Sequence, residues 1–166
     1  MHMVSAIGQD SHRFDNLSPV IGHGDVLRPL WLGGVEFPEG PPLQGKSDAD
    51  VVLHALCNAI SGITGVNIIG DYADQMRHDN HIIDSASYVK EAMKYLGDAK
   101  IVHASFSIEC SVPKISPLIY KIRSNIAKII GTEVNEVCIT ATSGEGLTDF
   151  GRGFGIQVLC IITAMK

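Results

Sequence analysis

Two short segments of this 166-residue chain carry side chains that suit metal chemistry. One is the triplet Asp10-Ser11-His12, and the other is His54, which lies in the apolar run 51–56. Residues two apart in a β-strand point to the same side, so Asp10 and His12 can offer a carboxylate oxygen and an imidazole nitrogen to one point. With His54 as third ligand, this set suits a divalent transition metal, zinc first, and leaves a fourth position for water or a substrate oxygen.

The surroundings of His54 decide between a metal ligand and an ordinary core histidine. A D-x-H triplet also arises by chance, and a single histidine on an apolar helix is often a hydrogen-bonded core residue. Asp50 lies four residues before His54, so its carboxylate could accept the other ring N–H and fix the tautomer. Alternatively, Asp50 is only a first-turn acid that the helix dipole favours.

Composition predicts one domain over residues 1–166, because 45% of the residues are hydrophobic and 19% are charged. The net charge of -5 and the lack of a Lys/Arg run argue against a nucleic-acid partner, although a small polyanion remains a suitable ligand. The longest apolar runs, 51–56 and 156–164, fall short of the roughly 20 residues of a membrane span. With no secretory signal visible, we expect a soluble, cytoplasmic protein without a membrane partner. The cysteines lack C-x-x-C spacing and are expected to be reduced core thiols: Cys57, Cys110, Cys138 and Cys160.

Elements of both kinds alternate along the chain without a strict βαβ rhythm. Alternating and apolar runs predict strands at 4–8, 30–37 (a strand or a hairpin turned at Gly33-Gly34), 102–109, 137–142 and 156–163. Helical spacing and capping signals predict helices from 47–50 onward, from 84 or 85 to 96, and from 116 to 131. The last strand is nearly all apolar, which predicts burial on both faces, with another subunit as the second cover.

Three glycine-containing segments could bind phosphate. Thr142-Ser143-Gly144-Glu145-Gly146 offers hydroxyls, freed amides and a carboxylate, as a phosphate-plus-magnesium site requires, although a simple turn would look similar. Residues 151–155 carry Arg152, which could meet an anion, but lack G-x-G-x-x-G spacing. Residues 40–47 match the letters of a Walker A motif, but they follow no buried strand and two prolines stiffen them, so we reject an NTPase.

Taken together, these motifs resemble the 2-C-methyl-D-erythritol 2,4-cyclodiphosphate synthase family over nearly the whole chain. The segments that carry the resemblance are Asp10-x-His12, Gly33-Gly34-Val35, Ser47 to Leu56, Gly70-Asp71, Asp84-Ser85, Pro113-Lys114, Ala141 to Glu145 and Gly151 to Ile156. The resemblance implies an α+β fold with a small mixed β-sheet and helices packed on one face. It also implies a homotrimer, with the sheets facing the three-fold axis and active sites between neighbouring subunits.

The implied activity is that of a metal-dependent phosphorus–oxygen lyase of non-mevalonate isoprenoid synthesis. A 2-phosphate oxygen of 4-diphosphocytidyl-2-C-methyl-D-erythritol 2-phosphate attacks the β-phosphorus, closes the cyclic diphosphate and expels CMP. Because both reacting groups belong to one molecule, positioning and charge neutralisation dominate the catalysis. Two alternatives remain: a non-catalytic trimeric ligand-binding paralogue of the same fold, and a zinc phosphohydrolase that uses metal-bound water.

The resemblance also implies roles for individual residues. Asp10, His12 and His54 would hold one zinc ion per subunit, and Glu145 would hold magnesium or manganese on the substrate diphosphate. The residues that would be catalytic or contact phosphate are Lys46, Ser47 and Ser143. The residues that would bind the rest of the substrate are Asp71, Cys110, Pro113, Lys114, Thr142 and Arg152. Thr142 and Ser143 would act from the adjacent subunit.

The chain departs from the family pattern at three places. Lys46 replaces a common histidine; a lysine can neutralise phosphate but cannot exchange a proton near neutral pH. Residues 76–80 replace an F-P-x-T-D segment, and residues 65–67 form a small insertion before it, so substrate-side contacts are expected to change. Phe154 takes the place of an acidic residue, and Arg152 is therefore expected to lose a nearby carboxylate.

Overall fold

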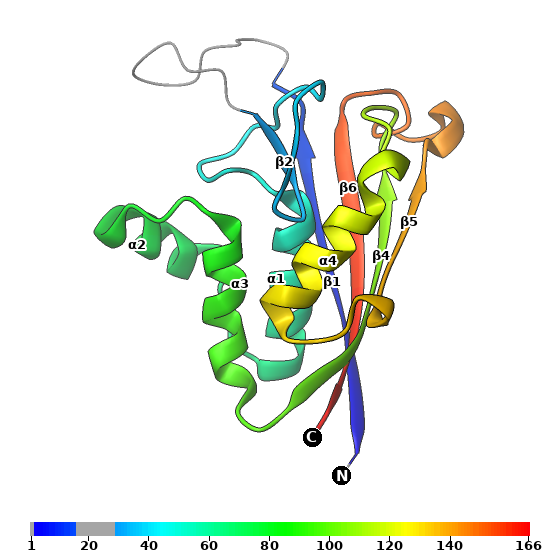
Figure 1. The fold of residues 1–166 in the computed structure, drawn as a ribbon. Coiled ribbons are helices and arrows are strands. Elements are labelled where there is room, and N and C mark those ends of the chain that lie inside the picture. The colour runs from blue at the N-terminus through cyan, green and yellow to red at the C-terminus, as the bar shows by residue number, and fades with distance from the viewer. Residues whose placement is uncertain (1, 16–28) are drawn as a thin grey trace.

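The protein is described by a computed structural model that covers residues 2–15 and 29–166. Its centre is a four-stranded mixed sheet with the strand order β1-β6-β4-β5, and the helices cover one face of it (Figure 1). The strands are β1 (Met3–Arg13), β4 (Lys100–Glu109), β5 (Val137–Thr142) and β6 (Gly155–Met165). β6 pairs antiparallel with both β1 and β4, whereas β4 and β5 are parallel. The predicted α+β class and mixed sheet are confirmed.

Three helices pack on the sheet or on each other, and a fourth projects from the body of the molecule (Figure 1). The helices are α1 (Val51–Thr64), α2 (Asp71–Asn80), α3 (Ser85–Met93) and α4 (Ile119–Ile130). Short 3₁₀ turns lie at Lys94–Leu96, Ser116–Leu118, Val134–Glu136 and Gly144–Gly146, and a hairpin is formed by β2 (Leu30–Leu32) and β3 (Val35–Phe37). Helix α1 lies against β1 and β6, α4 lies against β5, and α3 packs on α1 and α4.

The two faces of the sheet differ in what covers them. Alternate residues of β6 are buried beneath the helices: Ile156, Val158, Cys160, Ile162 and Ala164. The opposite face leaves large hydrophobic side chains exposed, including Ile7 at 61% and Ile161 at 49%, which pair directly across β1 and β6. The predicted two-sided burial of the last strand is therefore not achieved within one chain.

Close contact between β1 and α1 depends on a residue without a side chain. A Cβ atom built on Gly8 would lie 2.1 Å from the carbonyl oxygen of Ala55 and 2.3 Å from the amide nitrogen of Ala59. The backbone of the strand therefore lies directly on the backbone of the helix. Because Gly8 lies two residues before Asp10 in the same strand, this contact also sets how close the strand's side chains come to the first turn of α1.

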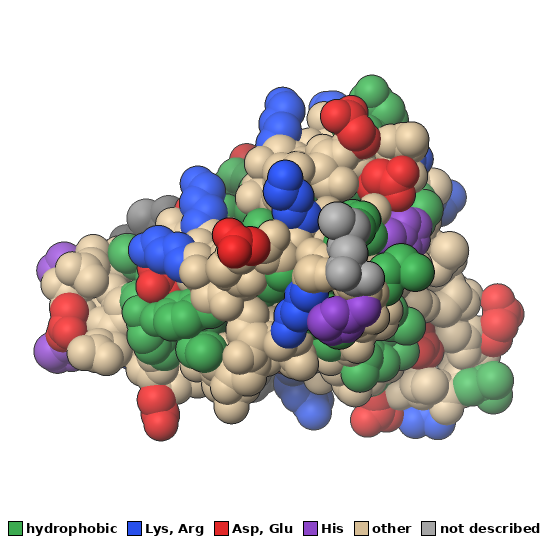
Figure 2. All heavy atoms as spheres, turned by 90° about the horizontal axis from the view of Figure 1, so that it is seen from below, with side chains coloured by type: hydrophobic (Ala, Val, Ile, Leu, Met, Phe, Trp, Pro, Cys, Tyr) green, Lys and Arg blue, Asp and Glu red, His purple; other side chains and the backbone are tan. Residues whose placement is uncertain are grey.

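The two ends of the described chain lie side by side where β1 begins and β6 ends, far from the β2–β3 hairpin (Figure 1). The amide of His2 donates to the carbonyl of Lys166, and the amide of Lys166 donates to the carbonyl of His2, both over 2.9 Å. Seen from this end, the surface mixes hydrophobic side chains with charged side chains of both signs, with no field of a single sign (Figure 2). None of the helices in the described ranges has the length and hydropathy that a membrane span requires.

Several details differ from the sequence-based expectations. Strand β1 continues to Arg13, so Asp10 and His12 lie inside it rather than beyond its end. Helix α1 begins at Val51, so Ser47 lies in the loop before it and not in its first turn. Helix α2 was not predicted, because its sequence is polar and only Ala73 is buried. Of the four cysteines, Cys138 is exposed and the other three are buried.

The Gly8 contact can be tested with a valine substitution. We expect Gly8→Val to lower the free energy of unfolding by about 3 kcal/mol, since the new side chain must separate α1 from β1. Chemical denaturation followed by circular dichroism measures this change. Gln9→Ala, on the exposed face of the same strand, should leave stability within about 0.5 kcal/mol. Equal stability of both variants would show that the strand and helix are not in close contact at Gly8.

Candidate metal centre

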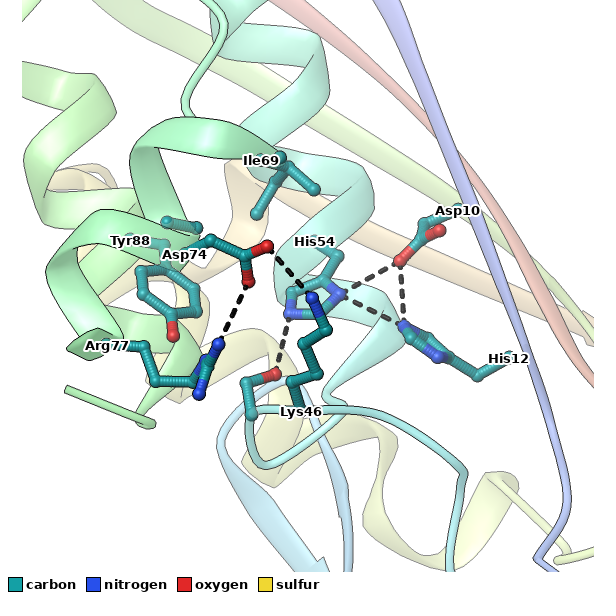
Figure 3. Close-up of a pocket in the computed structure, with 11 residues that line it drawn as sticks. Asp10, His12, Lys46, His54, Ile69, Asp74, Arg77 and Tyr88 are labelled. Atoms are coloured by element: carbon teal, nitrogen blue, oxygen red, sulfur yellow. Dashed lines mark hydrogen bonds and ion pairs between the residues drawn. The ribbon is translucent and has the colours of Figure 1, made fainter. Parts of the chain in front are cut away.

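Three side chains from two elements converge beside the first turn of α1. The Asp10 Oδ2 atom lies 2.9 Å from His54 Nδ1 and 3.1 Å from His12 Nε2, and the two imidazole nitrogens lie 3.1 Å apart. The three groups point toward one another in Figure 3. Ligand atoms around a tetrahedral zinc ion lie about 3.3 Å apart, so this triangle has the size of one metal site. Within the described residues, these are the three that form such a group.

The partner of His12 fixes which of its nitrogens is free. His12 Nδ1 lies 2.7 Å from the backbone carbonyl oxygen of Gln44. A carbonyl can only accept, so Nδ1 must carry the proton and neutral His12 presents a lone pair at Nε2. The loop before α1 thereby orients His12 with its basic nitrogen toward Asp10 and His54.

A serine and an aspartate fix the tautomer of His54. Ser85 Oγ is hydrogen-bonded to the Asp48 carboxylate, and His54 Nε2 lies 2.9 Å from the same Oγ. The carboxylate can only accept, so the single hydroxyl proton of Ser85 is used on Asp48 and the oxygen must accept from His54 Nε2–H. His54 therefore presents its lone pair at Nδ1, toward Asp10. The Ser85 amide also donates to Asp48 over 2.9 Å, which holds the aspartate in place.

This hydrogen bonding leaves three acceptors facing one another: two imidazole lone pairs and a carboxylate oxygen. Such an arrangement is unfavourable unless a cation or a proton lies between them, and so the donor set fits a divalent metal ion. When protons on His12 and His54 take the place of the metal ion, both rings donate to Asp10; burial alone would raise the pKa of Asp10, but these hydrogen bonds outweigh it and hold the pKa below its usual range. Burial alone would likewise lower the pKa of His12, and Asp10 instead raises it.

Of the two roles considered for Asp50, the structure favours the one at the start of the helix. Its side chain contacts backbone amides and not the His54 ring: it accepts from Val52 and Leu53 as the N-cap of α1. It also accepts from the amides of Gly33 and Gly34, over 2.8 and 2.6 Å, at the turn of the β2–β3 hairpin. The alternative in which Asp50 orients His54 is therefore wrong, and Ser85 with Asp48 orients it instead. Those two residues lie 31 and 6 positions from His54, so no helical spacing relates them to it.

A cavity of about 240 Å³ opens beside the three ligands. Ser47 lines it, is 8% exposed, and lies with its Oγ 3.3 Å from His54 Nε2 and 3.1 Å from the amide of Ala49. Lys46 lines it too and forms an ion pair with Asp74 of α2 at 3.0 Å. Asp71 begins α2 next to Gly70, which also lines the cavity, while Asp71 itself is exposed.

The predicted magnesium and phosphate residues lie on the far strand of the sheet. Thr142 ends β5, and in strand order β5 is three steps from β1, which amounts to about 14 Å. Ser143 Oγ donates to Glu145 Oε1 over 3.1 Å, and both residues are exposed. Glu145 adopts a φ of 50°, which is uncommon for a residue other than glycine. One chain therefore does not bring Glu145 and Thr142 into the cavity beside His54.

The other predicted substrate residues also lie away from that cavity. Pro113 and Lys114 line a separate cavity of about 560 Å³ with residues 37–40. Cys110 is buried, and burial raises its pKa to about 11, so it is a neutral thiol. Arg152 pairs with Asp149 at 3.0 Å. Phe154 supplies no carboxylate to Arg152, as expected, but the preceding turn supplies a different one.

The fold and this centre together define a small α+β protein with a three-ligand metal site between a sheet and its first helix. The chain belongs to the YgbB family, whose family model matches residues 3–165. A 2-C-methyl-D-erythritol 2,4-cyclodiphosphate synthase of Chlamydia felis is 44% identical over 161 residues, which cover 96% of this chain and 88% of that protein.

Solved structures have the same fold. The bifunctional IspDF from Campylobacter jejuni superposes with a TM-score of 0.83 and 25% identity, over 98% of this chain and 42% of that longer chain. A 2C-methyl-D-erythritol 2,4-cyclodiphosphate synthase from Plasmodium vivax gives a TM-score of 0.78 over 99% of both chains. Its identity of 21% makes it a match of fold alone.

The Ser85 contact with His54 predicts a measurable effect on metal affinity. We expect Ser85→Ala to weaken zinc binding by roughly tenfold, because His54 loses the acceptor that fixes its tautomer. Competition titration with a chromophoric chelator measures the affinity. Ser87→Ala is the matched control, since the Ser87 hydroxyl lies on the same helix but bonds only the exposed Asp84 among the described residues. An unchanged affinity in Ser85→Ala would refute the orienting role.

Proposed function

We propose that this protein converts 4-diphosphocytidyl-2-C-methyl-D-erythritol 2-phosphate to 2-C-methyl-D-erythritol 2,4-cyclodiphosphate and CMP. The observation that carries the proposal is the convergence of Asp10, His12 and His54 beside a cavity lined by Lys46 and Ser47. Family membership over residues 3–165 supports the same activity. We also propose a cytoplasmic location, which fits cysteines that are free of disulfide bonds.

The side chains around the cavity supply positioning and charge. Ser47 Oγ accepts from the Ala49 amide and lies within reach of His54 Nε2–H, so its own proton can be donated to a phosphate oxygen. The Lys46 ammonium adds a positive charge at the cavity wall. Bringing two phosphate groups of one substrate together requires such neutralisation, because their mutual repulsion opposes ring closure.

The ligand set defines where the metal would act. Asp10 Oδ2, His12 Nε2 and His54 Nδ1 would hold one zinc ion, which supplies a Lewis acid and a fixed positive charge to a phosphate group. Glu145 would hold magnesium or manganese between the two phosphates of the diphosphate. Asp71 would meet the methylerythritol hydroxyls, and Cys110, Pro113, Lys114, Thr142 and Ser143 would hold the cytidine and its phosphate.

A homotrimer would bring these two groups of residues, from neighbouring subunits, into one active site. Glu145 and Thr142 lie at the edge of the sheet opposite the metal ligands, so an active site built from both needs a neighbouring subunit. The exposed hydrophobic face of β1 and β6, with Ile7 and Ile161, supports such an assembly, because exposing hydrophobic side chains to water is unfavourable and a neighbouring subunit would bury them. The sheets would then face the three-fold axis, with Arg152 lining the central cavity.

Replacing His54 tests the activity. We expect His54→Ala to lose bound zinc and to reduce CMP release by at least about a hundredfold, since one of three ligands is removed. Metal content by mass spectrometry and CMP release by chromatography measure the two effects. His103→Ala, which removes a partly exposed histidine of β4, should change neither. Full CMP release by metal-free His54→Ala would reject the proposal.

Product analysis separates the two alternatives from cyclisation. Phosphorus NMR of the wild-type reaction should show the cyclic diphosphate, whereas a binding paralogue would leave the substrate unchanged. A zinc phosphohydrolase would incorporate oxygen-18 from solvent water into its product, and cyclisation incorporates none.

The shared active site predicts complementation between two inactive variants. Co-expressed His54→Ala and Glu145→Gln subunits should recover about a quarter of wild-type activity, since in random trimers that fraction of sites pairs an intact His54 with an intact Glu145. Each variant alone should be inactive. CMP release by the whole co-purified trimer population, without separation of homotrimers from mixed trimers, measures this against each variant alone. Mixed trimers as inactive as the single variants would place both residues in one subunit's site.

A further inference from the structure

The wall of the cavity that faces the metal ligands is formed by helix α2. Asp74 and Arg77 lie one turn apart on α2, and both line the cavity with Lys46. In Figure 3 they lie on the opposite side of His54 from His12. This helix contains the segment 76–80, at which the sequence analysis found a departure from the family pattern.

One carboxylate on this wall serves two cations. Asp74 Oδ2 lies 3.0 Å from Lys46 Nζ, and Asp74 Oδ1 lies 3.6 Å from Arg77 Nη2. The hydrogen bond from Lys46 lowers the pKa of Asp74, so the group is a carboxylate at neutral pH. The three side chains therefore carry a net positive charge beside the metal ligands.

Arg77 has bonding capacity that the protein does not use. Its Nε atom is buried and makes no hydrogen bond within the described part of the chain. A guanidinium offers five N–H donors in a fixed fork, which matches two phosphate oxygens at once. A buried donor without an acceptor is unfavourable, and a bound phosphate oxygen would remove that penalty.

We propose that Arg77 and Lys46 together bind a phosphate group of the substrate. In the protein without substrate, Asp74 forms ion pairs with both cations, and the phosphate displaces it. The bound phosphate is the one that the metal ligands do not hold, so the two groups are held on facing walls of one cavity. This inference rests on the proposed function, because the substrate named there carries a diphosphate and a separate 2-phosphate, of which one would meet the metal ligands and the other Arg77 and Lys46. Arg77 would thus offset the loss of a histidine at the position of Lys46 by adding a second permanent charge.

The proposal predicts opposite effects for two neighbouring residues. Arg77→Gln should weaken binding of inorganic phosphate to the zinc-loaded protein about tenfold, and raise the substrate KM by a similar factor with a smaller effect on kcat. Asp74→Asn should strengthen phosphate binding by about threefold, because the competing anion is removed. Arg77→Lys should fall between Arg77→Gln and wild type. Phosphorus NMR titration with inorganic phosphate measures the affinities.

Control measurements separate this proposal from a structural effect and from the proposed function. Lys128→Gln removes one exposed positive charge on α4 and should bind phosphate as the wild type does. If Asp74→Asn weakens phosphate binding, or Arg77→Gln leaves it unchanged, the proposal is overturned. The phosphate titration does not depend on turnover. A wild-type protein that releases no CMP but shows the predicted phosphate affinities would refute the cyclase activity and support the Arg77 site.

Discussion

The site depends on how the Asp50 carboxylate holds two pieces of backbone together. Its oxygens accept from two amides at the start of α1 and from two amides at the β2–β3 turn, while the side chain is fully buried. A carboxylate is stable without water only when such donors replace its hydration. Asp50 therefore fixes where α1 begins, and His54 projects from the first turn that this cap defines.

The second requirement is that strand and helix come close enough for their side chains to meet. Gly8 lets the β1 backbone lie on Ala55 and Ala59, which places Asp10 and His12 beside His54. His12 donates a hydrogen bond to the Gln44 carbonyl and His54 donates one to the Ser85 hydroxyl, and these bonds turn the two imidazoles so that their lone pairs converge. The metal centre is thus preorganised by contacts that lie outside its three ligands, and these contacts are as specific as the ligands themselves.

Local patterns predicted the parts of this structure that depend on local spacing. Strand periodicity placed Asp10 and His12 on one side, and apolar spacing with Gly131 as a stop predicted helix α4. Contacts between distant segments could not be read in this way. The Ser85–Asp48 pair reaches His54 only after α3 has packed on α1, and α2 has no apolar stripe that would reveal it. The homotrimer and the roles of Glu145 and Lys114 came from resemblance and remain proposals.

The pairing of His2 with Lys166 has a consequence for how this domain can be built into longer chains. His12 lies nine residue steps along β1 from Met3, which at the usual rise per residue is about 30 Å. A polypeptide attached at either terminus would therefore start beside the other terminus and far from the metal ligands. Fusion to a second enzyme therefore requires no remodelling of the centre, which fits the longer bifunctional chain of Campylobacter jejuni, of which this fold matches 42%.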